Sequence, residues 1–302
     1  MAENNLAGFI WSVADILRGD YKQSMYGRVI LPFTVLRRLD CVLVDTKDMV
    51  LAEYARIKDM GIDIEPVLTR KTGKKFYNIS SLNFERLLDD PQNIESNFKK
   101  YLYGFSPNVA DIMEHFDFQR FIEQLEERGL LYQVTQKFAS INLHPERITN
   151  QDMGNIFEEL IRRFSESSNE TAGEHFTPRE VIRLMVNLLF NLDDKALTGP
   201  VVRRMYDPAA GTGGMLSEAE DYLLSMNPDA QLVPFGQELN PESYAICKAD
   251  MLIKGHDTSN IVYGNSFTHD GFRGKAFDYM LSNPPFGSDW KKIKHPIDKE
   301  HQ

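Results

Sequence analysis

Hydrophobic residues in the first half of the chain recur at steps of three and four positions. One series is Phe9, Ile10, Val13 and Leu17, and another is Val29, Ile30, Phe33, Leu36, Leu39 and Leu43. This spacing gathers apolar side chains on one face of an α-helix. We expect a further helix over residues 109–127. The pattern predicts an all-helical domain over residues 1–148.

Strand and helix patterns alternate in the second half. Helices are expected at 151–164, 178–190, 215–226 and 241–254, and strands at 201–206, 232–236, 261–263 and 277–282. Strand, crossover and strand at this spacing predict a doubly wound, mostly parallel α/β sheet in a second domain over residues 149–302. Ligands of such sheets bind at the carboxyl ends of the strands.

One helix carries a clear start signal. The sequence Thr177-Pro178-Arg179-Glu180 has the form of a capping box, with proline at the first helical position. It predicts a helix from Pro178, with Thr177 as its cap.

Composition limits the class of protein. The chain has 302 residues and 42% hydrophobic content, enough for about two domains with separate cores. It has no apolar run of about 18 residues and no secretory leader, so we expect a cytoplasmic protein without a membrane segment. Cys41 and Cys247 have no second ligand at metal spacing, so we expect buried thiols and no metal site.

The formal charge of −10 argues against a protein that grips nucleic acid unaided. Lysine and arginine contacts to phosphate dominate non-specific DNA affinity. If DNA is the substrate, another subunit or a small basic surface must supply most of the binding.

A glycine-rich segment, Asp207-Pro208-Ala209-Ala210-Gly211-Thr212-Gly213-Gly214, directly follows the first expected strand. Glycines let the backbone turn sharply and let a nucleoside-type ligand approach. A tight turn without a ligand is the alternative. A dinucleotide is disfavoured because the spacing is Gly-x-Gly-Gly rather than Gly-x-Gly-x-x-Gly.

Polar residues follow the next two strands. Glu238 stands where a doubly wound fold places an acid to accept hydrogen bonds from ribose hydroxyls. A plain acidic residue before the next helix is the alternative. Asn265 is placed to meet an adenine ring, although an ordinary asparagine turn would explain it as well.

The last strand runs into Asn283-Pro284-Pro285-Phe286. Each proline locks its own φ and restricts the preceding residue, so this loop is stiff. An exocyclic adenine amine is a poor nucleophile, and two acceptors would correct this by drawing it toward tetrahedral geometry. The Asn283 side-chain oxygen and the Pro284 carbonyl are suited to that role, and Phe286 could stack on a base flipped out of the duplex.

With these motifs together, the sequence resembles the modification subunit of type I restriction-modification systems, an S-adenosylmethionine-dependent DNA adenine-N6 methyltransferase. The likeness rests on the helical first domain, on Gly173 to Arg179, on the glycine loop and on Asn283 to Phe286. It implies a Rossmann-like methyltransferase domain with catalytic residues Asn283, Pro284, Pro285 and Phe286. It also implies a set of cofactor-binding residues: His175, Phe176, Thr177, Asp207, Ala209, Gly211, Thr212, Gly213, Glu238 and Asn265.

The resemblance further implies partners. These are duplex DNA with a flipped adenine, a separate specificity subunit, a second modification subunit, and a restriction subunit when cleavage occurs. Chains of this family continue past the catalytic tetrapeptide, so we expect the sheet to be incomplete at its C-terminal end.

Two other functions stay open on the sequence. The same loop can present an RNA adenine or a protein glutamine amide for methylation. The chain could also be a catalytically silent scaffold that folds without turnover.

Overall fold

A computed structural model describes residues 3–168, 177–194 and 196–285 of the chain. The chain divides into two compact units. The helical unit is Met1–Glu170 with Leu252–Gly255, and the sheet unit is Thr171–Met251 with His256–Gln302. In the described part, no helix is long and apolar enough to cross a membrane.

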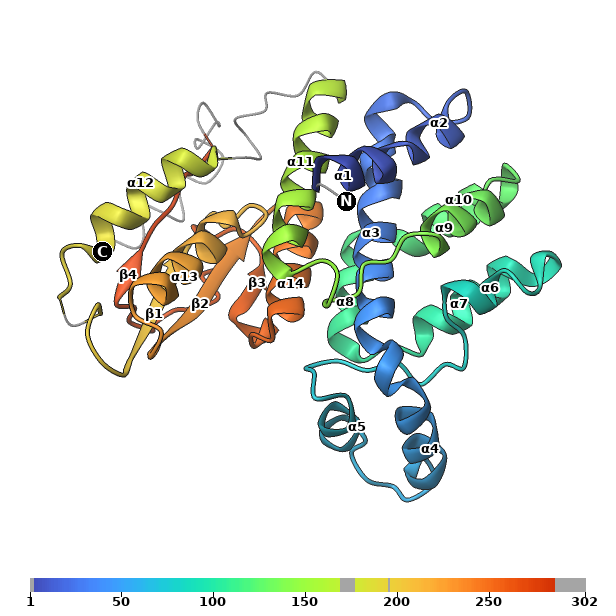
Figure 1. The fold of residues 1–302 in the computed structure, drawn as a ribbon, viewed down its shortest axis with the longest axis horizontal. Coiled ribbons are helices and arrows are strands. Elements are labelled where there is room, and N and C mark those ends of the chain that lie inside the picture. Colours follow the sequence, from blue (N-terminus) through green and yellow to red (C-terminus); the bar gives the residue numbers. More distant parts are fainter. Residues whose placement is uncertain (1–2, 169–176, 195, 286–302) are drawn as a thin grey trace. The chain divides into compact units, whose positions relative to one another are not determined.

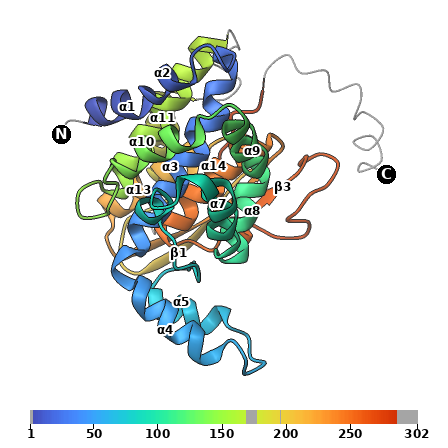
Figure 2. The ribbon, with the colours of Figure 1, turned by 90° about the vertical axis from the view of Figure 1, so that its right-hand side faces the viewer.

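The helical unit confirms the all-helical prediction for the first half of the chain (Figure 1). Its helices are α1 Glu3–Trp11, α2 Val13–Leu17, α3 Tyr26–Leu43, α4 Lys47–Ile57, α5 Glu65–Thr72, α6 Phe84–Leu87, α7 Ile94–Tyr103, α8 Pro107–His115, α9 Phe118–Glu127, α10 Leu131–Ala139 and α11 Asn150–Ser168. Helix α3 is buried along most of its length, and α1 and α11 pack beside it. Helices α4 and α5 lie against each other (Figure 2).

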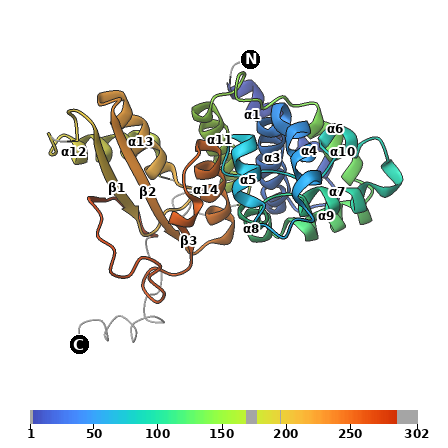
Figure 3. The ribbon, with the colours of Figure 1, turned by 90° about the horizontal axis from the view of Figure 1, so that it is seen from below.

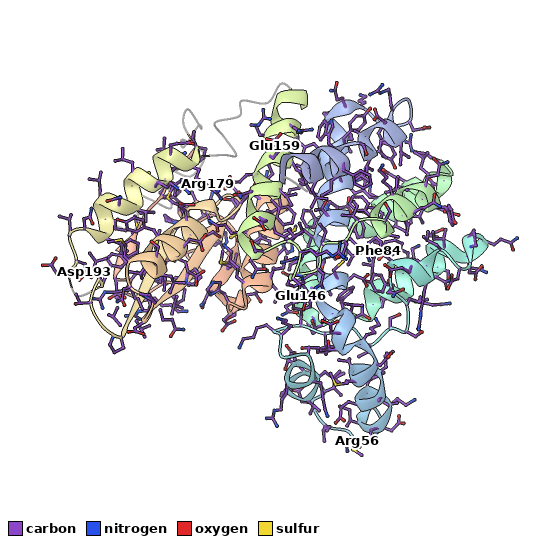
Figure 4. The ribbon with its side chains drawn as sticks, viewed as in Figure 1. Arg56, Phe84, Glu146, Glu159, Arg179 and Asp193 are labelled. Carbon is purple, nitrogen blue, oxygen red and sulfur yellow. The ribbon has the colours of Figure 1, made fainter. Side chains whose placement is uncertain are left out.

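Aromatic rings fill the core of the helical unit. The Phe33 ring of α3 stacks on Phe138 at 5.1 Å between centroids and meets Phe118 edge-on at 5.0 Å. Phe84, labelled in Figure 4, packs edge-on against Phe98 in the same cluster. Offset and edge-on ring pairs are the favoured geometries, so this cluster stabilises the unit beyond the burial of its area.

Two arginines of α3 tie down the segment after α10. Arg37 donates to the carbonyls of Ala139 and Ile141, at 3.0 and 2.8 Å. The fully buried Arg38 donates to the carbonyl of Ile148 and to the Asn150 side chain. These hydrogen bonds give partners to backbone carbonyls that have none within a helix or sheet. They thereby fix the path of the chain into α11.

The single helix expected over residues 109–127 is wrong. The structure has α8 and α9 instead, separated at Phe116 and Asp117. Asp117 has φ 53°, in the left-handed region, and this conformation interrupts the helix. A short polar side chain tolerates that region better than most, but periodicity alone does not reveal it.

The described residues of the sheet unit form a four-stranded parallel sheet in the order β3-β2-β1-β4. The strands are β1 Val201–Asp207, β2 Ala230–Glu238, β3 Ile261–Tyr263 and β4 Tyr279–Met280, and the helices are α12 Arg179–Phe190, α13 Gly214–Met226 and α14 Pro241–Lys254. Figure 3 shows β1 and β2 side by side with α13 across them. The sequence-based fold class is therefore confirmed.

The two faces of the sheet are covered differently. On one face α12, α13 and α14 share a core with Met205, Leu232 and Ile261. On the other face Tyr206 and Phe235 pack against Phe272 and Phe277 of the connection between β3 and β4. This agrees with the right-handed rule for crossovers: stepping from β1 to β3 places helices on one face, and returning to β4 passes over the other.

Element boundaries differ from the predictions at several points. Strand β2 runs through Pro234 and is longer than expected, while β4 comprises only Tyr279–Met280. Helix α14 begins as predicted, because the Asn240 side chain accepts a hydrogen bond from the Ser243 amide at 3.0 Å. Helix α12 begins at Arg179, with Pro178 in the capping position. The predicted capping role of Thr177 is therefore wrong.

Candidate active site

The carboxyl ends of β1 and β4 meet at the point where the strand order reverses. From β1 the chain proceeds to β2 and β3 on one side, whereas β4 lies on the other side. The Leu281 amide donates to the Tyr206 carbonyl at 3.1 Å, which brings the residues after both strands together. Such a switch point is where open α/β sheets bind their ligands.

The glycine loop after β1 is held by backbone hydrogen bonds to β2. The Ala210 amide donates to the Gln237 carbonyl at 3.0 Å, and the Gly211 amide donates to the Glu238 carboxylate at 2.7 Å. Gly211 has φ 53°, and a β-carbon added there would meet no atom within 4 Å. The loop therefore borders open space at Gly211.

Gly213 has a different reason to be glycine. Its φ is 85°, and a β-carbon would lie 2.8 Å from the Cys247 sulfur of α14. The close approach of the loop to α14 thus excludes any side chain. Cys41 and Cys247 are both buried thiols, as predicted. Thr212 and Ala209 lie half-buried on the same loop.

Glu238 connects the loop to the start of α14. One carboxylate oxygen accepts from the Gly211 amide, and the other accepts from the Asn240 amide at 2.6 Å. These two hydrogen bonds from backbone amides fix the carboxylate at the end of β2. Each oxygen keeps a second lone pair that can accept a hydrogen bond from a ligand hydroxyl.

Asp207 ends β1 and is only 1% exposed. The pKa of its carboxyl group is raised from 3.8 to about 7, chiefly by burial and to a smaller extent by the nearby Glu238 charge. A 3.0 Å hydrogen bond from the Ala209 amide and the neighbouring Ser282 hydroxyl oppose that shift in the pKa. A buried carboxyl that titrates near neutrality is typical of functional sites.

The segment after β3 closes this end of the sheet. The Asn265 side chain accepts from the Phe267 amide at 2.9 Å, which is the asparagine turn that the sequence left open as an alternative. Its neighbour Ser266 donates to the Pro208 carbonyl and so links the segment to the glycine loop. The Asn265 oxygen is engaged locally, and its amide nitrogen is the group that can face a ligand.

Asn283 follows β4 and is half-buried, while Pro284 and Pro285 are exposed. The Asn283 side-chain nitrogen donates to the Thr177 hydroxyl at 3.0 Å. The structure thus brings together Thr177, from the residues before α12, and Asn283, from the loop after β4. His175, Phe176 and Phe286 lie outside the described residues.

Ion pairs hold the elements that carry these two residues. The Glu218 carboxylate of α13 lies 3.3 Å from Arg179 and 2.6 Å from Arg183, both on α12. Asp193 accepts from Tyr279 of β4 and, at 3.0 Å, from Arg203 of β1. Figure 4 labels Arg179 at the start of α12 and Asp193 beyond its end. Hydrogen bonds from Arg203 and Tyr279 lower the pKa of Asp193 to about 2, so this contact is ionic at neutral pH.

Comparison with known families decides which protein class this geometry belongs to. The family described as N-6 DNA Methylase matches residues 149–302, and the HsdM N-terminal domain matches residues 6–138. The chain belongs to the N-6 DNA methylase family. The resemblance drawn from the sequence motifs is thereby confirmed.

Several curated relatives of this chain are methylase subunits of type I restriction enzymes. The MjaIX methylase subunit of Methanocaldococcus jannaschii is 26% identical over 93% of this chain and 51% of its own length. The EcoKI methylase subunit of Escherichia coli K12 is 30% identical over 46% of this chain and 28% of its own. The chain thus spans about half the length of the MjaIX subunit, and the EcoKI match covers a smaller part.

A solved structure shares the fold. The methyltransferase subunit of a type I restriction-modification system from Streptococcus thermophilus superposes with a TM-score of 0.71, covering 99% of this chain and 66% of that one. Sequence identity in this superposition is 20%, so the likeness concerns the fold alone.

Sequence reasoning missed one residue that organises the site. Gln237 is fully buried, and its side-chain nitrogen donates to the His269 carbonyl at 2.8 Å. Its side-chain oxygen accepts from the Gly271 amide at 3.2 Å, so it fastens the connection after β3 to β2. A polar residue at an inward position of a strand was the available signal.

Among the described residues, no group of three or more His, Cys, Asp or Glu could hold a metal ion.

Proposed function

We propose that the chain carries the active site of a site-specific DNA adenine-N6 methyltransferase, the modification subunit of a type I restriction-modification system. One observation carries the proposal. The glycine loop follows β1 and Asn283 follows β4, and these two neighbouring parallel strands end side by side at the switch point of the sheet, in a chain of the N-6 DNA methylase family.

S-adenosylmethionine is the cofactor that fits the described groups. Gly211 borders open space where a ligand can approach, and the Glu238 carboxylate is fixed where it can accept from ribose hydroxyls. Asp207 supplies a buried acid beside the loop, and Asn265 supplies an amide. Bound S-adenosylmethionine supplies an electrophilic methyl group on a sulfonium.

Asn283 and Pro284 would act on the target amine. The Asn283 side-chain oxygen accepts one amine hydrogen and the Pro284 carbonyl accepts the other, which directs the nitrogen lone pair toward the methyl group. Held geometry of this kind lowers the entropic part of the barrier. Phe286, next in sequence, would stack on the extruded base. His175 and Phe176, carried over from the family resemblance, would contact the cofactor.

The acidic chain would depend on partners for DNA binding. With a formal charge of −10, it needs a specificity subunit to supply phosphate contacts and to read the sequence. A second modification subunit and, for cleavage, a restriction subunit complete the proposed assembly. The division explains why methyl-transfer chemistry and DNA recognition would reside in different chains.

A substrate assay tests the proposal. The chain and its specificity subunit are incubated with S-adenosylmethionine labelled on the methyl group, and with duplex DNA, RNA or protein. The expected product is N6-methyladenine in duplex DNA. Label only in RNA adenine or protein glutamine would assign the site to another substrate, and cofactor binding without any transfer would favour the silent scaffold.

A further inference from the structure

The contact between Asn283 and Thr177 has a direction. The Asn283 nitrogen is the donor and the Thr177 hydroxyl oxygen is the acceptor, 3.0 Å apart. Among the residues that the structure describes, the Asn283 side-chain oxygen has no hydrogen-bond donor. With respect to the described residues, the amide oxygen is thus available as an acceptor while the nitrogen is engaged.

We propose that Thr177 is a positioning residue for methyl transfer, which holds the Asn283 amide with its oxygen toward the target amine. The inference rests on the proposed function and deepens it. The family resemblance implies instead that Thr177 binds the cofactor, which is a different role with different consequences.

Orientation of the amide decides whether the site works. An adenine amine offers two hydrogens and needs acceptors. If the Asn283 amide were turned by 180°, its N–H donors would face the N–H donors of the amine, and no hydrogen bond could form. In the turned state the amide nitrogen would face the amine and its oxygen would face Thr177. In the structure the Thr177 hydroxyl accepts from the amide nitrogen, which is the productive orientation. In the turned state the hydroxyl could donate to the amide oxygen instead, so Thr177 holds the amide in place and the target amine, which needs an acceptor, selects the orientation. A methyl group at that point could do neither.

Thr177 is available because it does not cap α12. The helix begins at Arg179, and Pro178 holds an extended conformation with φ −54° and ψ 136° between Thr177 and the helix. The buried Glu218 of α13 pairs with Arg179 and Arg183, which fixes the first turn of α12. The hydroxyl is thus held by a docked helix and points to the loop after β4.

Steady-state kinetics with S-adenosylmethionine and cognate duplex DNA test the role. Thr177→Val keeps the shape but removes the hydroxyl, and we expect kcat to fall by roughly 10- to 100-fold while cofactor Kd stays within about twofold. Thr177→Ser restores the acceptor and should recover most of kcat. Thr198→Val, at an exposed threonine of the same unit, is the matched control and should leave both constants unchanged.

Two results would overturn the inference. One is a Thr177→Val enzyme with weaker cofactor binding and normal kcat at saturation, which would make Thr177 a cofactor ligand. The other is a Thr177→Ser enzyme as slow as Thr177→Val. Absence of transfer by the unmodified chain with its specificity subunit would instead contradict the proposed function.

A spectroscopic arm reads the contact without turnover. The Asn283 side-chain amide resonances are assigned by their loss in Asn283→Asp, and their exchange with solvent is measured. We expect slow exchange in the unmodified chain and in Thr177→Ser, and faster exchange in Thr177→Val. Equal exchange in all three would overturn the hydrogen bond itself.

Discussion

At the scale of single residues, Asp207 places an ionisable carboxyl group in a buried position of the site. Its carboxyl lies at the end of β1, 1% exposed, and accepts one amide hydrogen bond from Ala209. Water is excluded and Glu238 is nearby, so the ionised form is disfavoured and the pKa rises to about 7. The folded protein therefore binds this proton more tightly than the unfolded chain does.

The shift in the Asp207 pKa predicts a pH-dependent stability. Between the unfolded pKa of 3.8 and the folded value of about 7, the free energy of unfolding should fall as pH rises, then level off. The slope from this group is about 1.4 kcal/mol per pH unit. Denaturant unfolding of the unmodified chain and of Asp207→Asn across pH 4–8 checks it.

Asp207→Asn removes the titrating group, so its unfolding free energy should lack this component of the slope. The exposed Asp194→Asn serves as control and should follow the unmodified protein. Parallel pH curves for the unmodified chain and Asp207→Asn would show that the Asp207 pKa is not raised.

Gly211 predicts a loss of cofactor binding on substitution. Gly211→Val places a branched side chain in the open space of the loop and at φ 53°, so S-adenosylmethionine affinity should fall by at least about tenfold. Gly199→Val is the matched control, since Gly199 has φ 69° and equally open surroundings. Isothermal titration should show the loss only in Gly211→Val. Equal affinities would mean that the ligand does not approach Gly211.

At the scale of elements, the sequence predicted strand and helix order well because burial patterns set it. The Asn240 cap and the glycine loop could be predicted from the sequence, since their signals are local. Three other features could not be predicted. Asp117 interrupts a helix by its own backbone conformation, and Thr177 bonds to a partner over a hundred residues away instead of capping α12. Gln237 bonds to one backbone carbonyl and one backbone amide of the connection after β3.

Helix α12 shows why a sequence pattern needs tertiary context. Ile182, Val186 and Phe190 lie in the core, whereas Leu184 and Leu188 are 61% and 62% exposed. Apolar residues therefore lie on more than one side of the helix, and periodicity alone does not say which side docks.

Substitutions on α12 should separate the two sides. Phe190→Ala empties a site packed against Tyr222 and Tyr279, and should cost about 3–5 kcal/mol of unfolding free energy. Leu188→Ala, on the exposed side, should change it by about 0.5 kcal/mol or less. Equilibrium denaturation of both variants measures the difference, and equal losses would contradict the burial assigned to Phe190.

At the scale of the whole molecule, net charge sets how the chain meets DNA. With a formal charge of −10, the chain alone should bind duplex DNA weakly at physiological salt, and addition of the specificity subunit should produce site-specific binding. Fluorescence anisotropy with cognate and scrambled duplexes measures both. Tight, sequence-specific binding by the chain alone would contradict this division of roles.

Asn283 is proposed to act on an adenine amine beside a cofactor held at the glycine loop. The most direct measurement compares methyl transfer to cognate duplex DNA by the unmodified chain and by Asn283→Ala, each with the specificity subunit, alongside S-adenosylmethionine Kd by calorimetry. The account predicts that N6-methyladenine formation falls to background in Asn283→Ala while Kd stays within about twofold. Retained methyl transfer, with weakened cofactor binding, would contradict it.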